Sequence, residues 1–284
     1  MRMKALKNMK IRPFVFLPIM IFLLSFSLFG CNKNSNISGI FDEELPGVNT
    51  DWEEDSFEYN EALTGKNLSI LGDSISTYQG ISNDISNGLG QNQVFYSTQM
   101  SVKDTYWYQI MKRYGMNLCV NNSWSGAYAS MHTPNVGSHI DSDGSVSSGI
   151  ARANNLSRAD GTTPDYIIVF IGINDLDANV SSDVVFDAYE QILDTIEGKY
   201  PNARVLCVNL PNRINCYSPV DINEGIKTAV EGHKNAYLVN LYDSEYSGLS
   251  FHYNSLNDNL HPNALGMDLL TDIIIEAMEK VALD

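Results

Sequence analysis

The chain has 284 residues, with 34 acidic and 18 basic side chains, and a formal net charge of −16 at pH 7. So acidic a chain is poorly suited to bind nucleic acid, because phosphate binding requires clustered basic side chains. Anionic lipid surfaces would repel it too, which argues against a phospholipase that works on a bilayer.

Residues 1–30 carry the pattern of a lipoprotein signal peptide. Residues 1–12 hold five basic side chains and no acidic one, and an apolar run follows over residues 14–29. The run is short for a transmembrane anchor and ends at a small residue. The sequence Leu28-Phe29-Gly30-Cys31 resembles a bacterial lipobox. We therefore expect export and lipid anchoring at Cys31 to the bacterial cell membrane or cell surface, with an ordinary signal peptide as the alternative.

Residues 31–63 are rich in acidic side chains and poor in residues that form a core. This composition predicts a flexible tether between the lipid and a folded domain over residues 64–284. Trp52, Phe57 and Tyr59 are the exceptions and are candidates to dock on that domain. Without the five basic residues of the signal peptide the net charge changes from −16 to −21, which favours solubility.

The domain begins with an apolar run over residues 68–71 that predicts a buried strand, followed by the turn Gly72-Asp73-Ser74. Such a turn places Ser74 at the carboxyl end of a strand, where open α/β sheets bind their ligands. Gly-Asp-Ser alone is an ordinary turn sequence, so a nucleophilic role for Ser74 depends on the rest of the chain. Residues 78–103 have no clear period and predict a long loop, a class that is usually functional.

Two more polar turns follow predicted buried strands, one over residues 121–126 and one over residues 172–175. A glycine amide and an asparagine side-chain amide are neutral donors that can stabilise a developing oxyanion. Gly126 and Asn174 are the candidates. Asp175 either shapes the turn around Asn174 or is a solvated turn residue.

Loop residues beside these turns are candidates to line a substrate site. His132 and His139 either line it or are ordinary loop residues. Aromatic side chains in these loops can stack on a sugar or anchor the loops themselves: Tyr78, Tyr96, Trp124 and Tyr128.

The remaining periodicity alternates between helix and strand. A helix capped by Asp104 is predicted through residue 114. Strands are predicted over 165–171, 204–209 and 237–241, and further helices over 182–199, 222–231 and from 264 onward. Strands separated by helices predict one α/β domain with a parallel sheet between two helical layers.

Near the C-terminus, Asp258 and His261 stand three residues apart on a predicted turn. The carboxylate can hold one imidazole nitrogen while the other faces a serine hydroxyl, which needs such a base to become nucleophilic.

Together these four blocks resemble the SGNH hydrolases, the GDSL esterase/lipase family, over about residues 66–284. The matching residues follow the family order: Ser74, Gly126, Asn174 and His261, with Asp258 in the Asp-x-x-His arrangement. The first block has Ile75 where the family name has leucine, and the second block is less standard. The resemblance implies a five-stranded flavodoxin-like sheet of order 2-1-3-4-5, a Ser-His-Asp triad, an oxyanion hole formed by Ser74, Gly126 and Asn174, and no cofactor.

The classical α/β-hydrolase is the competing fold. Its nucleophile lies in a mid-chain Gly-x-Ser-x-Gly elbow, and its acid comes well before its histidine. Here Ser76 stands at the second glycine position and the acid and base share one turn. The sequence therefore favours the first fold.

The expected activity is hydrolysis of a carboxylic ester through an acyl-enzyme, with an acetylated glycan at the cell surface as the expected substrate. The alternatives are a lipase or lysophospholipase and a non-catalytic, glycan-binding surface lipoprotein. Cys119 and Cys207 read as small core residues, and a Cys207–Cys216 bridge is an open possibility after export. No grouping of Cys and His has the spacing of zinc ligands, so no metal is expected.

Overall fold

The computed structural model describes residues 58–82, 94–130 and 147–283. The predicted signal peptide, Cys31, His132 and His139 lie outside the described residues.

Residues 58–63, which the composition assigns to the tether, pack on the domain. Leu63 is fully buried. The Glu58 N–H donates to the Arg113 carbonyl at 2.6 Å, and the Glu58 carboxylate lies 3.2 Å from Arg113 Nε. Tyr59 stays 74% exposed, so it does not dock. Ordered structure therefore begins before residue 64.

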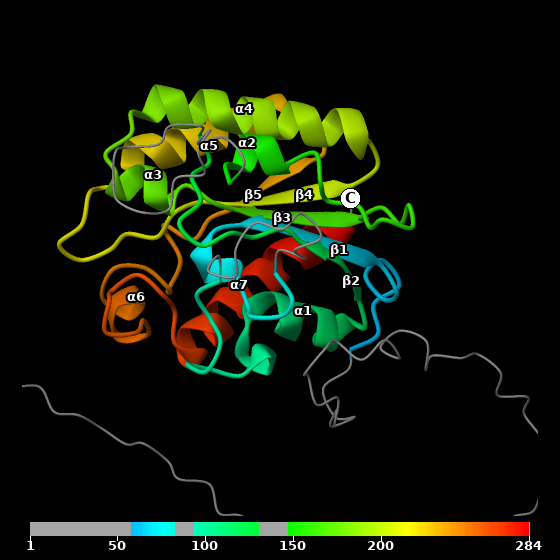
Figure 1. Cartoon of the computed structure of the whole chain (residues 1–284), viewed down its shortest axis with the longest axis horizontal. Coiled ribbons are helices and arrows are strands. Elements are labelled where there is room, and N and C mark those ends of the chain that lie inside the picture. The colour runs from blue at the N-terminus through cyan, green and yellow to red at the C-terminus, as the bar shows by residue number, and fades with distance from the viewer. Residues whose placement is uncertain (1–57, 83–93, 131–146, 284) are drawn as a thin grey trace, which may run out of the picture. The chain divides into compact units, whose positions relative to one another are not determined.

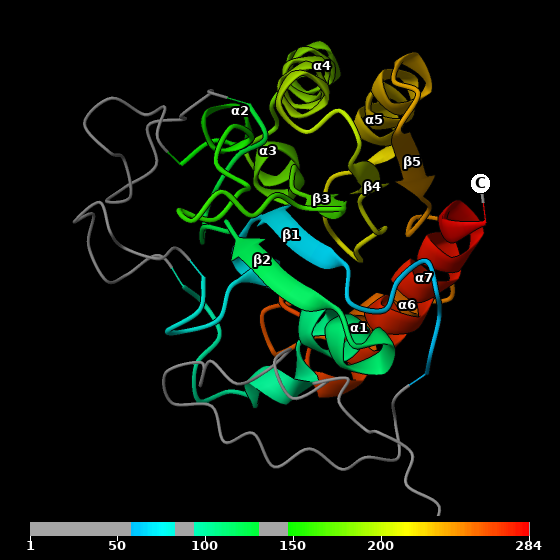
Figure 2. The ribbon, with the colours of Figure 1, turned by 90° about the vertical axis from the view of Figure 1, so that its right-hand side faces the viewer.

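Five parallel strands form a single sheet in the order β2-β1-β3-β4-β5, as the resemblance implied (Figures 1 and 2). The strands are β1 (Asn67–Gly72), β2 (Asn117–Asn121), β3 (Tyr166–Phe170), β4 (Arg204–Val208) and β5 (Ala236–Val239). Every residue of the central strand β3 is buried. Both faces of the sheet are therefore covered, as parallel sheets require.

Helices cover the two faces, which gives a three-layer α/β/α domain. The helices are α1 (Tyr106–Tyr114), α2 (Gly149–Arg152), α3 (Ile173–Asp177), α4 (Ser182–Lys199), α5 (Val220–Gly232), α6 (Leu249–Tyr253) and α7 (Ala264–Ala282). In Figures 1 and 2, α2, α3, α4 and α5 lie on one face of the sheet, and α1, α6 and α7 lie on the other.

The long elements match the sequence predictions closely, whereas the short helices α2, α3 and α6 were not predicted. The N-cap of α1 is Thr105 and not Asp104 as predicted, because residues 102–104 form a separate 3-10 turn. His252 belongs to α6.

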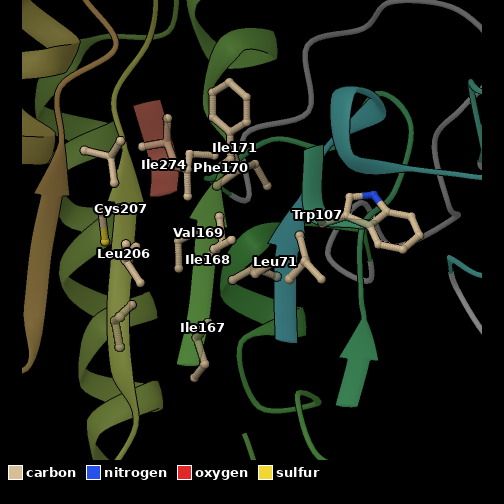
Figure 3. Packing of buried hydrophobic residues seen from close by; sticks show 14 of the residues in the cluster. Leu71, Trp107, Ile167, Ile168, Val169, Phe170, Ile171, Leu206, Cys207 and Ile274 are labelled. Carbon is tan, nitrogen blue, oxygen red and sulfur yellow. The ribbon is translucent and has the colours of Figure 1, made fainter. Parts of the chain in front are cut away.

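The core lies between the sheet and both helical layers. Figure 3 shows Leu71, Val169 and Leu206 on neighbouring strands, all buried, with Ile274 of α7 beside them. Cys207 is also part of this core, whereas Cys216 is exposed; both are free, so the possible bridge is not formed. Within the described part of the chain, no helix combines the length and apolar character needed to cross a membrane.

Candidate active site

The serine turn begins where β1 ends. A one-turn 3-10 helix, Ser74–Ser76, follows directly, and Asp73 caps it by accepting the Ile75 N–H at 3.0 Å. A Cβ added at Gly72 would lie 2.5 Å from Ser76 Oγ, closer than side-chain atoms approach. Glycine at this position therefore lets the chain fold back tightly and present Ser74 at the carboxyl edge of the sheet.

Ser74, His261 and Asp258 form a continuous hydrogen-bonded line. Ser74 Oγ lies 2.8 Å from His261 Nε2, and His261 Nδ1 lies 2.7 Å from Asp258 Oδ2. An ionised carboxylate only accepts hydrogen bonds, so Nδ1 carries the proton and Nε2 is free to accept one from the serine hydroxyl. This arrangement can activate a serine nucleophile.

The two ionisable groups of this line have shifted pKa values. Burial lowers the pKa of His261, and the hydrogen bond and charge of Asp258, which raise it, do not offset that effect; the charge of Arg213 lowers it further. Burial raises the pKa of Asp258, but hydrogen bonds from the His261 N–H, its ring and the Leu260 N–H outweigh it and the net shift is downward. At neutral pH the pair is therefore a neutral imidazole beside a carboxylate.

This pKa shift of His261 predicts the acid limb of the pH profile. A base must be neutral to act, so kcat/KM falls as the pH drops through the pKa of His261. Because that pKa is lowered from 6.5, we expect the midpoint of the acid limb below pH 6.5, measured with p-nitrophenyl acetate between pH 4 and 8. Arg213→Met removes a positive charge and is expected to move the midpoint upward. A parent midpoint at or above pH 6.5 would contradict the prediction.

The turn that carries Asp258 and His261 is held in place by hydrogen bonds to other segments of the chain. Asn259, between them, adopts a left-handed backbone with φ of 55°, a conformation that asparagine tolerates. Its Nδ2 donates to the Ile214 carbonyl at 3.0 Å, and its Oδ1 lies 2.9 Å from Nδ1 of His252 in α6. These contacts tie the turn to the loop after β4 and to α6.

Phe95 is a site residue that the sequence patterns did not single out. Its ring stacks on the His261 imidazole, with centroids 3.4 Å apart and planes 7° from parallel. The Phe95 N–H donates to Thr77 Oγ1 at 2.8 Å, and that hydroxyl donates to the Ser74 carbonyl at 2.8 Å. Phe95 therefore links the serine turn to the histidine.

The aromatic residues proposed to contact substrate differ in exposure. Tyr96 is fully buried and its hydroxyl donates to the Pro262 carbonyl at 2.8 Å, so of its two expected roles it has that of a loop anchor. The partly buried Tyr78 donates to the Ser97 carbonyl at 2.9 Å and anchors its own loop. Trp124 is 9% exposed and Tyr128 is partly exposed.

Gly126 and Asn174 lie on neighbouring segments. Asn174 Nδ2 donates to the Ala127 carbonyl at 2.8 Å, which occupies one of its two N–H groups, and the second has no partner among the residues that the structure describes. Gly126 is exposed and has a φ of 78°, a backbone conformation that glycine adopts without strain. Asn174 is thus hydrogen-bonded to the residue directly after Gly126, which holds the two predicted oxyanion donors near each other.

Asp175 strengthens the same connection and is not a solvated turn residue. It is fully buried and accepts the Ala129 N–H at 2.7 Å and the Ser130 hydroxyl at 2.6 Å. Asn174 and Asp175, consecutive residues of α3, therefore bind the segment that follows Gly126, over residues 127–130.

Asp73 and Arg152 are buried charged residues whose roles sequence reasoning missed. Asp73 is 1% exposed and Arg152 is 4% exposed. Burial raises the pKa of Asp73 to about 7, although the Ile75 N–H and Arg152 lower it. Burial lowers the pKa of Arg152 to about 9, so the guanidinium stays charged at neutral pH.

The raised pKa of Asp73 predicts a pH-dependent stability. Between pH 3.8 and about 7 the folded state retains a proton that the unfolded state has released, so the stabilising contribution present below pH 3.8 is lost as the pH rises to about 7. Asp73→Asn does not titrate. We expect its free energy of unfolding, relative to the parent, to rise by up to roughly 4 kcal/mol between pH 4 and pH 8, measured by urea denaturation. Parallel pH dependences for both proteins would refute this.

Comparisons with known proteins place this geometry in context. A model of the GDSL-like lipase/acylhydrolase family matches residues 70–269, which include Ser74 and His261. Among solved structures, one described as a GDSL-like lipase from Bacteroides ovatus is 26% identical, with a TM-score of 0.59, over 76% of this chain and 99% of its own. The comparison with curated proteins found no match.

Other solved structures are similar in fold alone. One described as a GDSL-like lipase from Bacteroides uniformis is 22% identical, with a TM-score of 0.55, over 76% of this chain and 96% of its own. A family 3 carbohydrate esterase from Clostridium thermocellum is 15% identical, with a TM-score of 0.51, over 77% of this chain and 98% of its own.

Proposed function

This chain belongs to the GDSL-like lipase/acylhydrolase family and is a hydrolase that acts on esters, and we propose that it works as a serine esterase with Ser74, His261 and Asp258 as its catalytic triad. The observation that carries this proposal is the hydrogen-bonded line from Ser74 Oγ through the imidazole to the Asp258 carboxylate, with distances of 2.8 and 2.7 Å.

In the acylation step, Ser74 Oγ forms a bond to the ester carbonyl carbon while its proton moves to His261 Nε2. The carbonyl oxygen becomes an oxyanion, which accepts hydrogen bonds from the Ser74 N–H, the Gly126 N–H and the Asn174 side chain. The bond between carbon and the alcohol oxygen then breaks, and Nε2 returns the proton to the leaving alcohol. An acyl-serine remains.

In the deacylation step, water takes the place of the alcohol. His261 Nε2 removes a proton from water as its oxygen attacks the acyl carbon, and the oxyanion forms again at the same donors. The bond to Ser74 Oγ breaks, and Nε2 returns the proton to that oxygen. Asp258 holds the ring orientation and stabilises the imidazolium in both steps.

We further propose acetylated glycans as the substrates, with the chain exported and lipid-anchored through Cys31. Tyr128, which is partly exposed and comes two residues after Gly126, supports a sugar-binding role, and the fold is shared with a carbohydrate esterase. The net charge of −16 disfavours work on an anionic bilayer. Lipid ester hydrolysis is the second candidate, because the Bacteroides ovatus protein at 26% identity is described as a GDSL-like lipase.

A substrate panel separates these candidates. Purified protein lacking residues 1–31 is assayed for acetate release from acetylated xylan and other acetylated glycans, and for hydrolysis of p-nitrophenyl esters of increasing chain length and of lysophospholipids. We expect glycan deacetylation and a preference for short acyl chains. Cleavage of long-chain or lysophospholipid esters alone would replace the glycan proposal with the lipase one. Glycan binding without any turnover would support a non-catalytic protein.

A further inference from the structure

Arg152 is the last residue of α2, and its guanidinium lies inside the protein behind the serine turn. Only 4% of the residue is exposed. Burial of a charge destabilises a fold unless the group is fully hydrogen-bonded. The contacts that offset this cost therefore indicate what the side chain holds together.

Within the described part of the chain, the acceptors of Arg152 are backbone carbonyls from three separate segments. Nη2 donates to the Gly72 carbonyl at 3.0 Å, Nε donates to the Ser147 carbonyl at 2.8 Å, and Nη1 donates to the Asn122 carbonyl. Gly72 is the last residue of β1, and Asn122 follows the last residue of β2. One rigid, planar group thus connects the carboxyl ends of two neighbouring strands.

Those two strand ends lead directly to the proposed oxyanion donors. Ser74 comes two residues after Gly72, and Gly126 comes four residues after Asn122. The Gly72 carbonyl also accepts the Trp124 N–H at 3.2 Å, so the same oxygen joins the serine turn to the Gly126 loop. The geometry of Arg152 therefore controls how far apart the two backbone donors stand.

The buried charge has one acidic neighbour on the serine turn. Asp73, 1% exposed, is the only group whose charge raises the pKa of Arg152 among the described residues. A positive charge beside the turn also favours negative charge that develops on the substrate oxygen next to Ser74.

Resting on the proposed serine esterase reaction, we propose that Arg152 is a positioning residue that sets the spacing of the Ser74 and Gly126 N–H groups in the oxyanion hole. Among the described residues its hydrogen bonds go to backbone carbonyls and not to the triad side chains. Lysine keeps the charge but loses the planar fork, whereas glutamine loses the charge but keeps planar N–H donors. Glutamine has only two N–H groups, and the three of lysine share a single nitrogen, so neither reproduces the contacts that Nε, Nη1 and Nη2 make from three separate nitrogens.

The test compares Arg152→Lys and Arg152→Gln with two controls. Asn174→Ala removes a proposed oxyanion donor directly. Arg204→Lys changes an arginine at the start of β4 that donates to the Tyr166 hydroxyl at 3.2 Å, away from the carboxyl ends of the strands. The measurements are kcat and KM for p-nitrophenyl acetate, affinity for a trifluoromethyl ketone that forms a tetrahedral adduct with serine, the pH midpoint of the acid limb, and urea denaturation.

We expect both Arg152 variants to lower kcat by about 10- to 10²-fold, because a misplacement of about 1 Å has effects of that size. Affinity for the ketone should fall by a similar factor, with little change in KM or in the acid-limb midpoint. Asn174→Ala should give the same signature, and combining it with Arg152→Lys should cost less than the product of the two losses. Arg204→Lys should change none of these values.

Three outcomes would overturn the proposal. Folded Arg152 variants with parental kcat and ketone affinity would show that Arg152 does not position the donors. If the losses of kcat and ketone affinity follow the loss of stability alone, and a destabilised Arg204→Lys shows the same losses, then Arg152 has only a general structural role. If hydrolysis by the parent protein does not depend on Ser74, the proposed function and this inference both fail. If hydrolysis depends on Ser74 but the Arg152 variants are unaffected, the inference alone fails.

Discussion

Ser74→Ala is expected to lower kcat for p-nitrophenyl acetate by at least about 10⁴-fold, since no acyl-enzyme can form without the nucleophile. The Ser74 hydroxyl lies 2.8 Å from His261 Nε2. The residue as a whole is 4% exposed. Alanine removes one oxygen atom and leaves the backbone N–H in place. Substrate binding and stability should therefore change little.

The rate measurement needs a serine control and a double variant. Ser181 is exposed and makes no cap hydrogen bond with its side chain, so Ser181→Ala should keep the parental rate. His261→Ala alone and Ser74→Ala with His261→Ala should have nearly the same residual rate, because triad residues act as a unit. Parental hydrolysis by Ser74→Ala would assign the activity to another group or to a contaminant.

Asp258→Asn is expected to lower kcat by about 10⁴-fold with little change in KM. Asp258 Oδ1 accepts the N–H groups of Leu260 and His261, both at 3.0 Å, and Oδ2 accepts from the ring. In the carboxamide, the oxygen keeps the place that accepts two backbone donors, so the NH₂ group faces Nδ1. That nitrogen must then accept, which moves the ring proton to Nε2 and prevents it from taking the proton of Ser74.

The matched control for this variant is Asp268→Asn. Asp268 is an exposed residue of α7 that accepts from Gln109 Nε2 at 2.8 Å, so it tests the loss of one carboxylate elsewhere on the domain. We expect parental kinetics from it. A rate for Asp258→Asn within tenfold of the parent would mean that the carboxylate does not set the tautomer of His261.

The sequence predicted the inner strands β1, β3 and β4 well because they are buried on both faces and appear as continuous apolar runs. Helix α4 was placed correctly over residues 182–199 because its apolar positions recur with helical spacing and Pro201 ends it. The short helices have too few residues for such a period. Asn174 was recognised as a turn residue, but its helix α3 was not.

The site residues that sequence reasoning missed are those whose roles depend on tertiary contacts. No local sequence pattern indicates the role of Arg152, because its three carbonyl partners lie in segments that are distant along the chain or irregular. Phe95 lies in a stretch without periodicity, and its contact with His261 joins residues 166 positions apart. Tyr96 looked available to substrate because a sequence does not show which loop side chains turn inward.

The flat contact between the Phe95 ring and the imidazole has a consequence for the two halves of the turnover. With the ring centroids 3.4 Å apart and the planes nearly parallel, the imidazole cannot swing about its Cβ–Cγ bond without breaking the stack. Nε2 therefore keeps one direction while it serves first the departing alcohol and then the incoming water.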